Sequence, residues 1–237
     1  RDPPLTVRAP AEGEAEISFS RPALFQLQRG GSLKLSRVAV TGRDAPDEVG
    51  NAVIRVAAGS NAANFEIIVE DSRVSDLIVN RGFDVIALGK GSMADRVLLK
   101  GVTVDNVSGA VVSAAAETDD RGTYNVETIR IEGGTFRRVG GPVVDLYRGG
   151  TDESTFGPRL SVTDAVFDKA GSVTTPALLM RGVQFAEVTG NRLTDSGAIR
   201  FSHRVGEPVL VVRDNQLVRT PPLESDTASV AVLPETL

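Results

Sequence analysis

Charged and aromatic side chains follow a series of short apolar runs in this sequence, and their chemistry suits a charged ligand. The residues just beyond these runs are Lys90, Glu117, Asp119, Asp120, Tyr124, Tyr147, Arg148, Asp152, Glu153, Arg181 and His203. Arg148 and Arg181 could pair with carboxylates, because a guanidinium matches a carboxylate with two parallel hydrogen bonds. Tyr147 or Tyr124 could stack on a ring, and an acidic pair could hold Ca²⁺. The pattern is typical of a groove for an anionic sugar chain.

The same residues also allow a purely structural interpretation. Mixed charges at the bases of solvated loops usually pair with one another, which would give a ladder of salt bridges between neighbouring repeats. In that interpretation the acidic residues organise two long loops, and the residues concerned are Asp145, Asp152, Glu153, Glu117 and Asp120. His203 and Lys90 likewise have two interpretations. Each could act as a general acid or base, or each could be an incidental loop residue.

The composition excludes several classes of protein. The formal net charge is −5, so we expect no nucleic-acid partner, which would select a basic surface. The chain has no Cys, which removes disulfides, thiolate nucleophiles and cysteine zinc sites. No apolar run approaches the about 18 residues of a membrane-spanning helix, so we expect no membrane partner. A P-loop, a dinucleotide fingerprint and a zinc-binding HExxH helix are all absent from the sequence.

A short pattern recurs along the chain: an apolar residue, any residue, Gly or Asp, any two residues, and a second apolar residue. Val69–Val74 and Leu99–Val104 are clear copies, and Leu35–Val40 is a weaker one with Arg at the centre. The central positions are 37, 71, 101, 133, 164, 190 and 214, so neighbouring copies are 24 to 34 residues apart. A second apolar run follows each copy. A repeat of this length indicates a protein built from stacked units.

These repeats predict an all-β protein, a single-stranded right-handed parallel β-helix of about seven to eight coils. The runs are short and lack a helical period, and the core must be aliphatic because only 5% of the residues are aromatic. Few hairpin signals argue against a sandwich or barrel, and the repeats are too short for a propeller. We expect one domain over residues 1–237, with residues 219–237 as a C-terminal cap or tail. Asn191 and Asn215 occupy equivalent positions, where they could begin an asparagine ladder.

The segment Tyr147–Pro158, with the sequence YRGGTDESTFGP, is the most specific motif of the chain. It resembles a signature in the C-terminal domain of polysaccharide lyase family six, the alginate lyase and chondroitinase-B family. The flanking segments that agree with this resemblance are Glu117–Glu127, Leu178–Gln184, Val205–Pro208, Phe83–Ile86 and Ala94–Val97. The resemblance extends roughly from residue 30 to residue 220.

The resemblance implies a right-handed parallel β-helix and a parent enzyme that cleaves uronate polymers by β-elimination. In that family Ca²⁺ commonly neutralises the substrate carboxylate, a Lys removes the neighbouring proton, and an Arg helps to protonate the leaving oxygen. The carboxylate charge must be masked because that proton is only weakly acidic. In two-domain members this machinery lies in the N-terminal β-helix, and its Lys-containing and Arg-His-Gly motifs have no counterpart here. We therefore assign no catalytic residue and no metal ligand to this chain, and place any Ca²⁺ in the catalytic domain of the parent protein.

Together these observations predict an accessory C-terminal domain of an alginate-degrading polysaccharide lyase, secreted or periplasmic and not catalytic by itself. Its expected partners are an N-terminal catalytic domain of the same polypeptide and an anionic polysaccharide such as alginate. The substrate-binding residues would be Tyr147, Arg148, Arg181, Tyr124, Lys90 and His203. One alternative is a self-sufficient Ca²⁺-assisted lyase built on Lys90, Arg148 and Arg181. The other is a non-enzymatic adhesin or fibre module, and a homodimer is an open alternative for the assembly.

Overall fold

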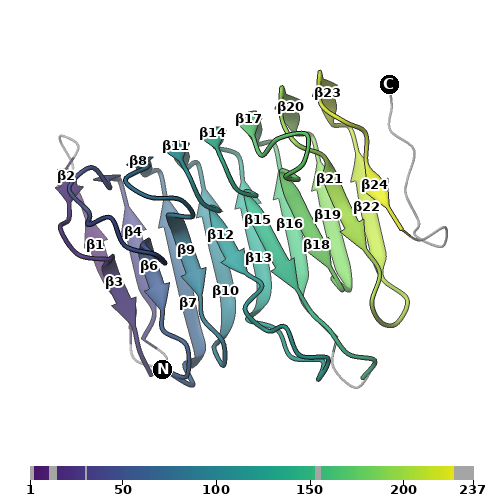
Figure 1. The fold of residues 1–237 in the computed structure, drawn as a ribbon, viewed down its shortest axis with the longest axis horizontal. Coiled ribbons are helices and arrows are strands. Elements are labelled where there is room, and N and C mark those ends of the chain that lie inside the picture. The colour runs from purple at the N-terminus through teal and green to yellow at the C-terminus, as the bar shows by residue number, and fades with distance from the viewer. Residues whose placement is uncertain (1–2, 11–14, 30, 153–155, 227–237) are drawn as a thin grey trace.

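The described part of the chain is a stack of β-strands. The structure is a computed structural model that describes residues 3–10, 15–29, 31–152 and 156–226. Within these ranges the strands form three parallel sheets of eight strands each. Figure 1 shows the strands advancing side by side from the N-terminal to the C-terminal end. The predicted parallel β-helix is therefore confirmed, and no described segment is a helix that could cross a membrane.

Each coil contributes one strand to each of the three sheets. Sheet A consists of β1 (Leu5–Arg8), β4 (Leu33–Ser36), β7 (Ala63–Glu70), β10 (Met93–Lys100), β13 (Val126–Glu132), β16 (Arg159–Thr163), β19 (Phe185–Thr189) and β22 (Val209–Arg213). Sheet B consists of β2 (Ala15–Ser18), β5 (Val38–Thr41), β8 (Arg73–Leu77), β11 (Thr103–Val107), β14 (Thr135–Val139), β17 (Val166–Ala170), β20 (Arg192–Thr194) and β23 (Gln216–Val218). Sheet C consists of β3 (Ala23–Leu27), β6 (Ala52–Val56), β9 (Asp84–Leu88), β12 (Val112–Ala114), β15 (Val144–Tyr147), β18 (Leu178–Arg181), β21 (Ile199–Ser202) and β24 (Glu224–Ser225). Eight strands in each sheet make eight coils.

Neighbouring coils pair in register, so that equivalent side chains stack inside the helix. One buried row in sheet A consists of Val97, Ile129, Leu160, Ala186 and Leu210 in successive strands. In sheet B the rings of Phe136 and Phe167 stack with their centroids 5.4 Å apart. Such rows remove a continuous column of apolar surface from water, at roughly 25 cal/mol per Å². The hydrophobic core therefore runs the length of the β-helix rather than gathering at one centre.

The repeated Gly or Asp lies at the corner between sheet A and sheet B. All seven predicted central positions have a left-handed backbone with φ between 47° and 70°, namely Arg37, Asp71, Gly101, Gly133, Asp164, Gly190 and Asp214. A residue in this conformation turns the chain sharply out of one strand and into the next. Gly adopts it without a steric penalty, and Asp tolerates it better than most residues. The sequence repeat is therefore the signature of this corner.

Asn191 and Asn215 follow the corner in successive coils and form the asparagine ladder that the sequence predicts. The buried Asn191 accepts a hydrogen bond from the Ala165 N–H at 2.9 Å and donates to the Val162 carbonyl at 2.9 Å. One coil further on, the Oδ1 of Asn215 accepts from the backbone N–H and Nδ2 of Asn191, and its Nδ2 donates to the Val188 carbonyl. The two amides thus satisfy backbone groups that the sheets leave unpaired at the corner.

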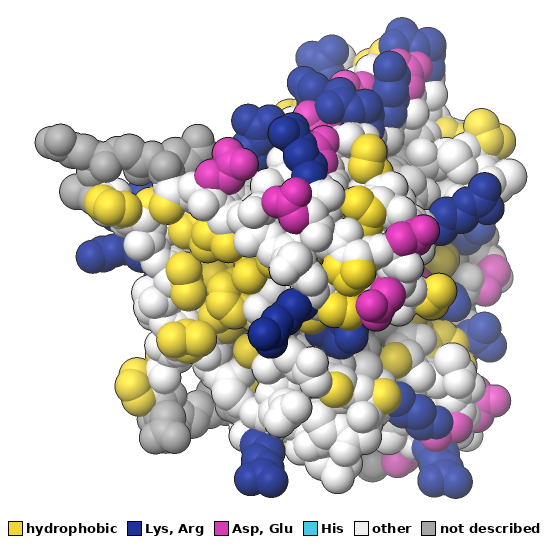
Figure 2. Space-filling model, turned by 60° about the vertical axis from the view of Figure 1, so that its left-hand side comes forward, with side chains coloured by type: hydrophobic (Ala, Val, Ile, Leu, Met, Phe, Trp, Pro, Cys, Tyr) yellow, Lys and Arg dark blue, Asp and Glu magenta, His cyan; other side chains and the backbone are white. Residues whose placement is uncertain are grey.

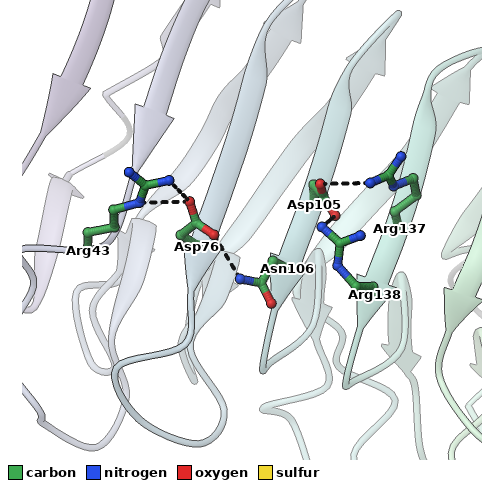
Figure 3. A network of polar contacts seen from close by, with 6 residues as sticks. All are labelled: Arg43, Asp76, Asp105, Asn106, Arg137 and Arg138. Carbon is green, nitrogen blue, oxygen red and sulfur yellow. Dashed lines mark hydrogen bonds and ion pairs between the residues drawn. The ribbon is translucent and has the colours of Figure 1, made fainter.

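The outer face of sheet B carries charges that pair between coils. Figure 3 shows this network, formed by Arg43, Asp76, Asp105, Asn106, Arg137 and Arg138. Arg43 binds Asp76 through Nε at 2.9 Å and Nη2 at 2.7 Å, and Asn106 donates to the other oxygen of Asp76 at 2.7 Å. The hydrogen bond from Asn106, followed by that from Arg43, lowers the pKa of Asp76. Asp105 is shared by the two arginines of the next coil, at 3.3 and 2.6 Å.

The N-terminal end leaves apolar side chains uncovered among the described residues. Figure 2 turns this end toward the viewer and shows a patch of hydrophobic side chains on it. The first coil contributes exposed or partly buried apolar residues here, namely Leu5, Val7, Ile17, Leu24 and Phe25. Its three strands have a sheet neighbour on one side only, and open apolar strand edges favour association with another β-structure. These five residues are called the N-terminal face below.

The C-terminal end continues the regular stack as far as the structure describes it. Within the expected cap or tail, residues 219–237, the short strand β24 pairs with β21 and so belongs to the last coil. Residues 227–237 lie outside the described residues.

Candidate functional site

Several of the charged and aromatic residues singled out in the sequence come together beyond the ends of the sheet C strands. Tyr147 is the register partner of Arg181, which in turn pairs with Ser202. The guanidinium carbons of Arg181 and Arg204 lie 5.3 and 5.9 Å from the centroid of the Tyr147 ring. The Tyr147 hydroxyl donates a hydrogen bond to Asp120 of the preceding coil at 3.3 Å. Four successive coils thus meet in the Tyr147 cluster, which comprises Asp120, Tyr147, Arg181 and Arg204.

A shallow depression of about 240 Å³ adjoins this cluster and is lined by Asp120, Gly150, Thr151 and Arg204. The loops after β12 and β15 form its wall, and they are in contact at Gly149 and Gly150. A Cβ on Gly149 would lie 2.7 Å from Oδ1 of Asp120, and one on Gly150 would lie 2.8 Å from the Asp120 carbonyl oxygen. Gly150 also has a left-handed backbone with φ of 81°. A side chain at either position would push the two loops apart.

Arg148 is fully buried, so the expected surface role does not fit its position. Its Nη1 donates to the Gly157 carbonyl at 2.7 Å, and its Nη2 donates to the Asp152 carbonyl at 2.5 Å. Its guanidinium carbon also lies 5.7 Å from the centroid of the Tyr124 ring. A buried guanidinium needs such acceptors because removing a charge from water is costly. Arg148 therefore fixes the two described ends of the loop after β15 instead of facing a ligand.

Tyr124 is also buried and therefore does not present its ring for stacking in solvent. Its hydroxyl donates to the two carboxylate oxygens of Glu127, at 3.2 and 3.1 Å. Burial, followed by the charge of Glu127, raises the pKa of Tyr124 to about 12. The hydroxyl lies so close to Gly157 that a Cβ there would be 2.6 Å from Oη. Tyr124 thus forms the floor under the segment that Arg148 holds.

Glu117 organises the loop after β12, as the structural interpretation of the acidic residues expects. Its buried carboxylate accepts the Gly91 N–H at 2.5 Å and Nδ2 of Asn125 at 3.3 Å. Asn125 is buried as well and also donates to the carbonyls of Gly89 and Ser92, at 3.1 and 3.2 Å. This pair ties the loop after β9 to the loop after β12.

Lys90 and Arg181 each have an acidic partner on the surface. Nζ of Lys90 lies 3.5 Å from Oδ2 of Asp119, and Nη2 of Arg181 lies 2.5 Å from Oδ1 of Asp145. Ion pairs that are open to solvent contribute at most about 1 kcal/mol, so a ligand can exchange them readily. The cross-coil salt bridges of the structural interpretation are therefore present at these two positions.

His203 contacts its own loop. One ring nitrogen lies 2.9 Å from the Gly206 carbonyl oxygen, and its backbone N–H donates to Asp226 at 2.8 Å. Glu153 lies outside the described residues. Among the residues that are described, no three His, Cys, Asp or Glu side chains are grouped as they would be around a metal ion.

Some residues of this region were not among the candidate binding residues named from the sequence. Arg204 could have been found, since it follows β21 where Arg181 ends β18, one coil earlier. Asn125, Glu127 and Gly157 lie within the motif segments named above but at no repeat position, because their roles arise from contacts between loops of different coils.

Asp84, at the start of β9, is a further, partly buried carboxyl, which lies in the segment Phe83–Ile86 named above but at no repeat position. Burial raises the pKa of Asp84 to about 7, the nearby carboxylate of Asp145 adds to the rise, and the hydrogen bond from the Ala110 N–H opposes it. That hydrogen bond measures 2.7 Å. Asp84 is therefore a carboxyl that titrates close to neutral pH.

The three parallel sheets and the loops between them define a parallel β-helix. Among solved structures, the chain is similar to the PL6 family alginate lyase AlyGC, with a TM-score of 0.91 and 29% sequence identity. That match covers 99% of this chain and 34% of the lyase. A mutant of AlyGC matches with a TM-score of 0.91 and 30% identity over 98% of this chain and 33% of the mutant. The chain thus spans about a third of the length of these enzymes.

The predicted resemblance to polysaccharide lyase family six is confirmed by these structures, because the chain is a PL6-like parallel β-helix. No family model matches the sequence. No curated protein matches it either.

The buried role of Arg148 predicts a large effect on stability. Arg148→Met keeps much of the side-chain volume but leaves the Gly157 and Asp152 carbonyls without their donor, so the free energy of unfolding should fall by about 3 kcal/mol. Arg181→Met removes a solvent-accessible ion pair in the next coil and should cost less than about 1 kcal/mol. Urea denaturation of both variants measures the difference. Equal effects of the two substitutions would contradict the assigned role of Arg148.

The raised pKa of Asp84 predicts a stability that declines as the pH rises. The folded chain holds the proton more tightly than the unfolded chain, so this contribution is complete at acidic pH and is lost as the pH passes through about 7. Asp84→Asn keeps the oxygen that accepts the Ala110 N–H but cannot ionise. Urea denaturation from about pH 5 to about pH 8 should therefore show a shallower decline for the variant than for the wild type. Parallel declines would show that Asp84 does not titrate in this range.

Proposed function

We propose that this chain is a non-catalytic β-helix domain of an alginate-degrading polysaccharide lyase. In this proposal it supports a catalytic β-helix of the same polypeptide and binds the anionic polysaccharide. The parent enzyme would act by β-elimination outside the cytoplasm, in a secreted or periplasmic location, because its polymeric substrate is found there. Any Ca²⁺ would belong to the catalytic domain.

The observation that carries the proposal is the extent of the structural match. Nearly the whole chain superimposes on an alginate lyase, yet it accounts for 34% of that enzyme's length. A lyase of that size has two thirds of its chain left to hold the catalytic residues. This length favours the role of an accessory domain over that of a complete enzyme.

The candidate residues of the self-sufficient lyase support the same choice. That alternative needs Lys90 as a base and Arg148 and Arg181 at the substrate. Arg148 is enclosed beneath the loop after β15, and the other two have carboxylate partners on the surface. A base and an acid for β-elimination must both reach one sugar ring, and a buried Arg148 is unsuited to that task.

The N-terminal face supports a partner domain. Its apolar side chains and open strand edges lie at one end of the stack, where a neighbouring β-structure would cover them. The proposal assigns this position to the catalytic domain of the same polypeptide. A second copy of the chain is the alternative occupant.

The proposal predicts binding without cleavage. The purified chain, incubated with alginate with and without Ca²⁺, should produce no ultraviolet absorbance from unsaturated sugar ends. In affinity electrophoresis, alginate in the gel should retard the chain, and added salt should weaken the retardation because the contacts are ionic. A complete alginate lyase serves as the positive control for the absorbance.

Two results would overturn this account. Formation of unsaturated ends by the purified chain, abolished in Arg181→Ala, would favour the self-sufficient lyase. Absence of both cleavage and retardation would favour an adhesin or fibre module.

A further inference from the structure

An aromatic platform lies on the outer face of sheet A and at the start of its strands. It consists of Phe156, Arg159, Phe185 and Val209. Arg159, Phe185 and Val209 are register partners at the starts of β16, β19 and β22, which Figure 1 shows side by side. The next residues in these strands point inward and are buried, so the three platform residues point outward. Phe156 is 54% exposed and Val209 is 42% exposed.

Arg159 is the charged member of this platform. Its guanidinium carbon lies 5.0 Å from the centroid of the Phe156 ring, within the range of a cation–π contact. Other basic side chains on the outer face of sheet A have carboxylate partners: Lys34 binds Glu70 at 2.7 Å, and Arg130 binds Glu132 at 3.0 Å. None of the described carboxylates forms such a pair with the exposed Arg159. Its charge is thus available to an anion from outside.

The exposure of Phe156 is imposed by a buried scaffold. Arg148 binds the carbonyl of Gly157, the next residue, at 2.7 Å, and Tyr124 lies directly beneath Gly157. Gly157 itself is buried, as is Pro158. The fold therefore places a buried guanidinium and a buried phenol under a phenylalanine that stays in solvent.

We infer that the platform binds a uronate residue of the anionic polysaccharide. The apolar face of a sugar ring would lie on Phe156 and Phe185, because exposed aromatic rings offer a flat apolar surface. The carboxylate of the same or the next sugar would pair with the guanidinium of Arg159. Glu187 lies two residues after Phe185 on the same face and repels a carboxylate placed there. This fixes which side of the platform the carboxylate occupies. The inference deepens the proposed function and rests on it.

The test is calorimetry of the full chain with a defined probe, an alginate tetrasaccharide. Arg159→Gln should raise the dissociation constant about tenfold, as expected for the loss of a charge-assisted hydrogen bond. Phe156→Ala should raise the dissociation constant several-fold, and Glu187→Gln should lower it. Arg130→Gln, which removes an arginine already paired on the same sheet, is the matched control and should change nothing. A neutral tetrasaccharide should bind more weakly than the alginate probe, by about the factor lost in Arg159→Gln.

The outcomes separate the inference from the proposed function. If the wild type binds the probe and neither Arg159→Gln nor Phe156→Ala changes the affinity, the inference is overturned while the proposed function stands. If the wild type does not bind the probe, the inference and the polysaccharide-binding part of the proposed function both fail. If the two variants keep their affinity but change the sedimentation of the chain from that of a dimer to that of a monomer, the platform is a protein contact and the inference is overturned. Both side chains are exposed, so the urea midpoint should stay unchanged in every case.

Discussion

In-register hydrogen bonding between successive coils is the constraint on which this molecule depends. Each strand pairs in parallel with the equivalent strand of the next coil, so a change of one residue in register would turn buried side chains toward solvent. The left-handed corner between sheets A and B makes this register possible, because it ends each sheet A strand at the same point. Buried asparagines such as Asn191 then form hydrogen bonds with the backbone groups that have no strand partner at the corner. The positions of the loops and of the outward-facing side chains are set by this arrangement.

The stacking creates two different kinds of surface. On sheet B, charges such as Arg43 and Asp76 pair between coils, which is the ordinary fate of mixed charges in solvent. Beyond sheets A and C, loops of unequal length leave the stack and are fixed by buried polar groups. Arg148 and Glu117 are the clearest of these, since each binds backbone groups that no strand partner satisfies. Arg148 and Glu117 thus tie the described parts of these loops to the coils beneath them, and a binding surface needs side chains that are held in place.

The sequence predicted the architecture well because the corner has a simple chemical requirement. Gly or Asp at one position in six of the seven corners reveals the repeat, and the apolar residues around that position reveal the strands. The row of residues beyond sheet C was also predictable, and Lys90, Tyr147 and Arg181 do meet neighbours from adjacent coils. The burial of Arg148 and Tyr124 was not predictable. It depends on how two loops pack over each other, and such contacts leave no periodic trace in the chain.

A pair of introduced cysteines tests the in-register stacking most directly, because the chain has none of its own. Arg130 and Ser161 are register partners on the outer face of sheet A, at the spacing of about 4.8 Å between neighbouring strands that a disulfide accepts. Arg130→Cys with Ser161→Cys should therefore oxidise readily to an intramolecular disulfide. Arg130→Cys with Thr163→Cys, two residues out of register, should remain reduced under the same conditions. Equal oxidation of the two pairs, or of the second alone, would contradict the register and with it the placement of every loop described above.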